Sequence, residues 1–153
     1  MDKILEIIRA SRKALLALVE DLTTEQLNKI PDGFNNNLAW QMGHLIVSQQ
    51  LLCYKLSNIP LTIDPNLVDK YRNGSKPERF ISADEIEQLK HDLLGVVDQL
   101  ETDLATNKFK EYFPYTISTY RGLKLESIED AVKFIASHDG LHYGCSLMMK
   151  KLV

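Results

Sequence analysis

The sequence predicts an all-α protein, a four-helix bundle with long second and third connections. Four segments carry apolar residues at helical spacing, and two of them open with a capping motif. The two longest connections between these segments cover residues 58–80 and 106–126. We expect residues 1–153 to form a single domain, because a chain of this length with 44 % apolar residues can bury one core without disulfides.

The first two helices are predicted from apolar periodicity. The first runs from Asp2 to Glu20, and its charged residues, Arg12 among them, are assigned to the faces outside the apolar stripe. The second begins after the asparagine cluster 35–37, where a side chain can cap free N–H groups, and runs to about Ser57. It is apolar around nearly its whole circumference, which predicts the most buried helix of the bundle.

The other two helices start at capping motifs. The third begins at Ser82 with Glu85 at the third helical position, and its apolar stripe extends to Leu104. The fourth begins at Ser127, with an aspartate at the equivalent position, and runs nearly to the C-terminus. Between them, residues 115–120 alternate in polarity, which favours either a short extended segment or an irregular aromatic loop.

Composition excludes several classes of function. A net charge of −3 without a basic stripe argues against a nucleic-acid partner. No segment has the length of a membrane span or the apolar run of a signal peptide, so no membrane association is expected. The two cysteines, Cys53 and Cys145, do not suggest a disulfide framework, and a reducing, cytoplasmic location is expected.

The histidines suggest a metal site. His138 and His142 are four residues apart on the apolar face of the fourth helix, so both rings can reach one ion. His44, in the most buried helix, is a candidate third ligand, whereas His91 falls on a solvated face. The alternative is that each buried histidine is a core residue with one hydrogen-bond partner. The motif lacks the glutamate of H-E-x-x-H, so it does not indicate a metallopeptidase.

Two segments together resemble one family. The stretch Asn37-Leu38-Ala39-Trp40-Gln41-Met42-Gly43-His44-Leu45-Ile46, with His138-Asp139-Gly140-Leu141-His142-Tyr143-Gly144, resembles the DinB/YfiT-like superfamily. The resemblance covers essentially the whole chain. It implies a four-helix bundle with zinc, nickel or a similar divalent ion on His44, His138 and His142. It also implies a transferase or isomerase that uses a low-molecular-weight thiol, and a homodimer.

Three nitrogen ligands would leave a position open on the metal, which is typical of catalytic sites. Bound water there would give a hydrolase, and a bound thiol would give a transferase acting on a small molecule. The resemblance favours the transferase, and no well-placed carboxylate is evident as a general base. A non-enzymatic module that binds a metal or ligand is the third possibility. Residues 58–80 and 112–120 are candidates for covering the pocket.

Several further residues are candidates near the site. Gln41 and Ser48 flank His44 by three and four residues and are candidates to orient an imidazole. Cys145 lies about 10 Å along the axis from His138, too far to share its ion, and is expected as a buried thiol on the cavity floor. Trp40 and Ser11 are further candidates for the pocket, although an aromatic residue in a bundle is usually part of the core and a serine within a helix more often bonds back to its own helix.

A row of small residues marks the opposite face of the fourth helix. Ala136, Gly140 and Gly144 lie on one side of it, away from the two histidines. Such a groove can admit a helix of a second subunit, although an ordinary exposed face is the simpler interpretation.

Overall fold

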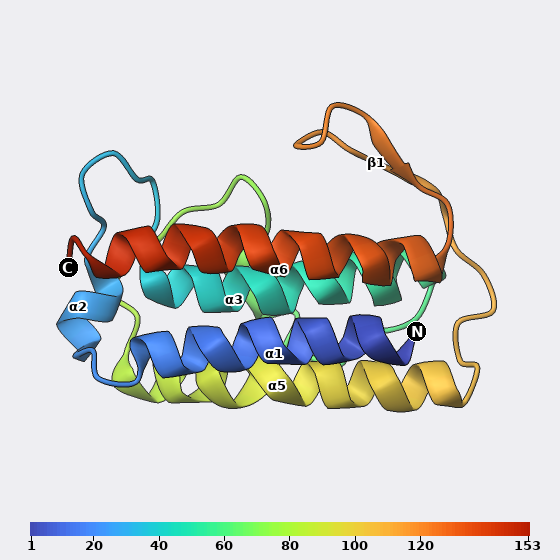
Figure 1. The fold of residues 1–153 in the computed structure, drawn as a ribbon, viewed down its shortest axis with the longest axis horizontal. Coiled ribbons are helices and arrows are strands. Elements are labelled where there is room, and N and C mark those ends of the chain that lie inside the picture. Colours follow the sequence, from blue (N-terminus) through green and yellow to red (C-terminus); the bar gives the residue numbers. More distant parts are fainter.

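Four long helices lie side by side in the computed structural model, which describes residues 1–153 (Figure 1). They are α1 (Asp2–Val19), α3 (Leu38–Gln49), α5 (Ala83–Ala105) and α6 (Ile128–Lys150). Helices α1 and α3 each pack against both α5 and α6, so α1 and α3 occupy opposite corners of the bundle. The predicted four-helix bundle is therefore confirmed.

Helix α1 has nearly the predicted bounds, but one of the charged residues predicted to lie outside its apolar stripe faces the core. Arg12 is completely buried, and its side chain points into the bundle. It lies on the same stripe as Leu5, Ile8, Leu15 and Val19, which are also buried. The prediction that Arg12 lies outside the apolar face is therefore wrong, because helical position and not residue type decides which side chain faces the core.

Helix α3 is the most buried element, as predicted. Every residue in it except Ser48 is buried. Its start is fixed by Asn37, whose side-chain oxygen accepts a hydrogen bond of 2.8 Å from the N–H of Trp40. The helix continues through a π-helical turn, η1 (Gln50–Tyr54), and a 3₁₀ turn, η2 (Lys55–Ser57), so the predicted end at Ser57 is also confirmed.

Short helices occupy the connections on either side of α3. Helix α2 (Thr24–Asn28) starts at a complete capping box formed by Thr23 and Gln26. Helix α4 (Asn66–Tyr71) lies within the segment 58–80, for which only a loop was predicted, and it packs against α3. Its six residues are too few to show a helical period in the sequence.

The third connection holds a small antiparallel hairpin. Strand β1 (Tyr115–Ile117) pairs with β2 (Leu123–Leu125), and the turn between them projects beside α6 (Figure 1). Of the two alternatives predicted for residues 115–120, the extended segment is thus confirmed for Tyr115–Ile117. Helix α6 then starts at Ser127, whose hydroxyl accepts from the N–H of Asp130 at 3.1 Å. None of the helices combines the length and the hydrophobicity that a membrane-spanning helix requires.

Candidate metal centre

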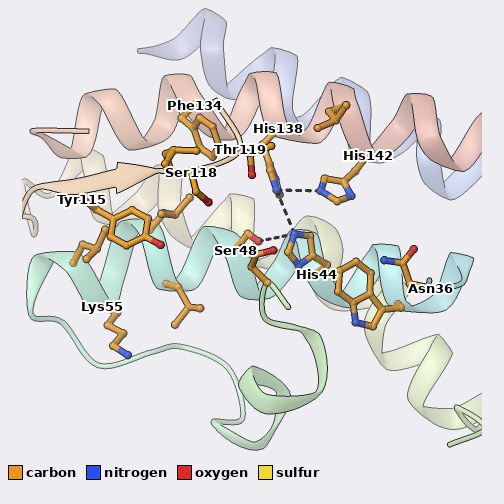
Figure 2. A pocket seen from close by; sticks show the side chains of 17 residues that line it. Asn36, His44, Ser48, Lys55, Tyr115, Ser118, Thr119, Phe134, His138 and His142 are labelled. Carbon is orange, nitrogen blue, oxygen red and sulfur yellow. Dashed lines mark hydrogen bonds between the residues drawn. The ribbon is translucent and has the colours of Figure 1, made fainter. Parts of the chain in front are cut away.

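Three histidine side chains from two facing helices converge (Figure 2). The Nε2 atom of His138 lies 3.3 Å from Nε2 of His44 and 3.1 Å from Nε2 of His142. One candidate ligand atom from each residue lies within 4.8 Å of the other two. The structure therefore brings together all three residues that the sequence singled out, and together they could hold a metal ion.

Two of the three rings are held through their other nitrogen. Nδ1 of His44 lies 2.7 Å from the main-chain oxygen of Tyr71. Nδ1 of His142 lies 2.5 Å from Oε1 of Gln41, whose amide nitrogen in turn contacts Asn36 and Met149. Because a carbonyl oxygen only accepts, each Nδ1 carries the proton and each Nε2 presents a lone pair to the centre.

The third ring shows why the cluster fits a cation. Nδ1 of His138 is buried without a hydrogen-bond partner. With the proton of His138 on Nδ1, that N–H would be buried without an acceptor and lone pairs would face one another across both Nε2 contacts; with the proton on Nε2, it could be donated to only one of the two facing nitrogens. A divalent ion removes this conflict. Tetrahedral zinc with bonds of about 2.0–2.1 Å separates its nitrogen ligands by about 3.3 Å, close to the separations observed here.

Burial keeps the rings neutral, as metal ligands must be. Desolvation, followed by the proximity of His142, His44 and Arg12, lowers the pKa of His138 to about 2. Desolvation and the nearby His44 lower the pKa of His142 to about 3, and burial also lowers the pKa of His44. At neutral pH no proton competes with a cation for the three nitrogens.

Neighbouring side chains hold His44 in its orientation. The Trp40 ring stacks on it at 4.5 Å with an interplanar angle of 11°. The hydroxyl of Ser48 lies 3.3 Å from Nε2 of His44, next to the position that a metal would take. Gln41, predicted to flank His44, instead contacts His142 across the helix pair. Trp40 and Ser48 therefore contact the cluster at His44, and Gln41 contacts it at His142.

Other candidates lie away from the cluster. Ser11 donates to the main-chain oxygen of Ile8 at 2.9 Å and does not line the cavity, so it is a serine bonding back to its own helix. Cys145 is a free thiol that is only half-buried and is absent from the cavity wall, so its predicted place on the cavity floor is wrong. Cys53 is in the core and His91 is exposed, both as expected.

Two contributions to the centre were missed by the sequence analysis. Tyr71 acts through its main-chain oxygen, which leaves no side-chain signal. The sequence signal is Gly43, a glycine inside an otherwise apolar helix. In the structure, a Cβ at this position would lie 2.5 Å from atoms of the Tyr71 ring. Arg12 forms a buried ion pair of 2.7 Å with Asp139, the neighbour of His138. The spacing of Arg12 from Ile8 and Leu15, with which it shares a stripe, could have revealed it.

A cavity of about 520 Å³ opens onto the cluster, between α3, α6 and the hairpin. Both segments expected to cover a pocket contribute to its wall, through Asn73 in one and Tyr115, Ser118 and Thr119 in the other. No aspartate or glutamate lines it, and Lys55 is its one lysine. The remaining wall is mostly apolar, formed by Leu51, Leu52, Leu56, Ile117, Phe134 and Leu141.

A four-helix bundle with three inward histidines on two facing helices defines a class of proteins that can bind a metal ion between their helices. The family model described as the DinB superfamily matches residues 7–146, a span that includes His44, His138 and His142. The chain therefore belongs to the DinB superfamily. No curated protein matches the sequence.

Proposed function

We propose that the protein is a divalent-metal-dependent enzyme, a transferase that joins a low-molecular-weight thiol to a small electrophilic molecule. The observation that carries the proposal is the convergence of three neutral Nε2 atoms on one point at the wall of a cavity. Zinc or nickel fits three imidazole ligands. Such an ion, with a position left open, would favour the thiolate form of a bound thiol.

Residues of the chain orient the histidine ligands and form a mostly apolar surface beside them. His44 and His142 are fixed by hydrogen bonds to Tyr71 and Gln41, so their lone pairs stay directed at the ion. The apolar part of the cavity wall offers few hydrogen-bonding groups to water, which would lessen the solvation of a nucleophile held beside the cluster. The Ser48 hydroxyl, 3.3 Å from Nε2 of His44, is placed to donate a hydrogen bond to a group bound beside that ring.

The cavity favours transfer over hydrolysis. A hydrolase that activates water commonly pairs the metal with a carboxylate base. No carboxylate lines this cavity, and the acid closest in sequence, Asp139, is buried against Arg12. A bound thiol needs no such base, because coordination to the metal itself favours deprotonation.

Metal content tests the first step. Protein purified without a metal-binding tag should contain close to one divalent ion per chain by elemental analysis. His44→Ala and His142→Ala should lose it, because each removes one of three ligands. His91→Ala is the matched control, since His91 is exposed and outside the cluster. Metal that stays bound in both ligand variants would contradict the proposal.

Turnover tests the second step. A set of thiols is assayed with an electrophile such as an epoxide or a chloronitrobenzene, and water alone serves as the control. Thiol consumption that requires the metal and is lost in His142→Ala supports a transferase. Metal-dependent hydrolysis without thiol would indicate the hydrolase, and bound metal with neither activity would indicate a binding module.

A further inference from the structure

Charge is distributed unevenly around the cavity. The three histidines are on one stretch of its wall, and Lys55 and Tyr115 lie together on the side away from Asn36 (Figure 2). Lys55 makes no ion pair, and no carboxylate lines the cavity. The cavity therefore has a cationic group that is free to bind a ligand.

Helical spacing aligns Lys55 with the metal site. It follows His44 by three turns of the continuous helix formed by α3, η1 and η2, roughly 16 Å along the axis. Ser48, Leu51 and Leu52 occupy the intervening turns and also line the cavity. One wall thus presents, in order, an imidazole, a hydroxyl, apolar side chains and an ammonium group.

The hairpin forms a second wall of the cavity, which also combines apolar and hydrogen-bonding side chains. Ile117 is buried, whereas Tyr115, Ser118 and Thr119 direct side chains toward the cavity, with the Tyr115 ring on the side where Lys55 lies (Figure 2). An extended molecule can therefore contact apolar groups along its length and hydrogen-bond donors at its end.

We propose that Lys55 forms an anion subsite, and that the cavity takes an amphipathic small organic anion with an apolar segment between its metal-binding end and a carboxylate. The ammonium group binds the carboxylate, and Leu51, Leu52 and Phe134 pack on the segment. The subsite names a substrate class for the proposed function and rests on it only for the metal-binding end.

Metal-free protein tests the subsite by itself. Octanoate and 1-octanol are titrated against it and followed through the amide resonances of Leu56 and Ser118. We expect octanoate to bind about fivefold more tightly, the effect of one partly solvated charge pair. Lys55→Met should make the two affinities equal by weakening octanoate alone, and Lys55→Arg should restore the preference. Lys133→Met, at an exposed lysine of α6 outside the cavity, should behave like wild type.

Two results would overturn the subsite. One is equal affinity of octanoate and octanol for wild type, and the other is a preference for octanoate that survives in Lys55→Met. A separate measurement uses cobalt-loaded protein with 6-mercaptohexanoate and 6-mercaptohexanol, read by the thiolate-to-cobalt absorption band. A protein that takes up no cobalt or gives no such band would refute the proposed function, while the octanoate result would still stand.

Discussion

Arg12 and Asp139 form a charged pair inside the bundle and link α1 to the helix that carries two of the histidines. Both side chains are buried, and Arg12 also donates to the main-chain oxygen of Leu93 at 3.0 Å. One carboxylate oxygen of Asp139 has no partner, so the pair is not fully satisfied. Pairs of this kind are costly to break but can be replaced by apolar residues.

Arg12→Met should lower the free energy of unfolding by about 3–5 kcal/mol, because it leaves the Asp139 carboxylate buried without its partner. The double variant Arg12→Met/Asp139→Leu should recover most of that loss. Urea denaturation of both variants beside wild type measures the difference. A double variant less stable than the single one would show that the pair itself, and not the unpaired charge, sets stability.

The lowered histidine pKa values predict loss of stability in acid. In the unfolded chain each histidine titrates near pH 6.5, whereas in the folded protein His138 and His142 remain neutral down to about pH 2 and about pH 3. Below pH 6.5 the unfolded state therefore binds more protons. The stability that neutral pH provides is lost as pH falls, by up to about 1.4 kcal/mol per pH unit for each ring.

Urea unfolding of metal-free protein at pH 7.5, 6 and 5 measures this slope. His138→Gln/His142→Gln should have a shallower pH dependence than wild type over the same range. His91→Gln is the control, because this residue is exposed and lies outside the cluster. Identical slopes in wild type and the double variant would contradict the assignment.

At the scale of elements, α4 is positioned by one glycine of α3. A Cβ at Gly43 would lie 2.5 Å from atoms of the Tyr71 ring, so only glycine lets the ring pack flat on the helix. That packing brings the Tyr71 carbonyl to His44. The backbone of α3 thus sets the position of the group that orients one ligand.

Gly43→Ala should displace α4 and weaken metal binding by about tenfold or more, the usual cost of losing a ligand's outer hydrogen bond. It should also lower the free energy of unfolding by about 1–3 kcal/mol through overpacking. Gly95→Ala is the matched control, because nothing lies within 4 Å of a Cβ there, and it should be neutral or stabilising. Chelator competition and urea denaturation give the two quantities. Unchanged metal affinity in Gly43→Ala would show that Tyr71 is not needed to orient His44.

The long helices and the three histidines were predictable because both follow from periodicity. The capping motif at Ser127 indicated the start of α6, apolar spacing indicated the inward direction of His138 and His142, and the Asn37 cap indicated the start of α3. Contacts across the bundle were not predictable in this way. The Gln41 amide reaches His142, 101 positions away in sequence, and only packing of α3 on α6 creates that contact.

At the scale of the whole molecule, one face of α6 has no partner within the chain. Leu147 and Met148 are 38 % and 53 % exposed and follow Gly144 by three and four residues, and an added Cβ at Gly140 or Gly144 would meet nothing within 4 Å. Exposed apolar residues that lie together are typical of interaction surfaces. We therefore propose that this face joins two copies of the chain, a state expected from the family resemblance.

Gly144→Glu should shift a dimer toward monomer by at least about tenfold in dissociation constant, because a symmetric interface would bury the new charge twice. The fold itself should tolerate the change, since the position is open in one chain. Gly95→Glu, at an equally open glycine of α5, is the control for any general effect of an added charge in a helix. Sedimentation equilibrium at micromolar concentration measures the constants. A wild-type monomer at that concentration, or a dimer equally weakened by both substitutions, would exclude this face of α6 as the interface.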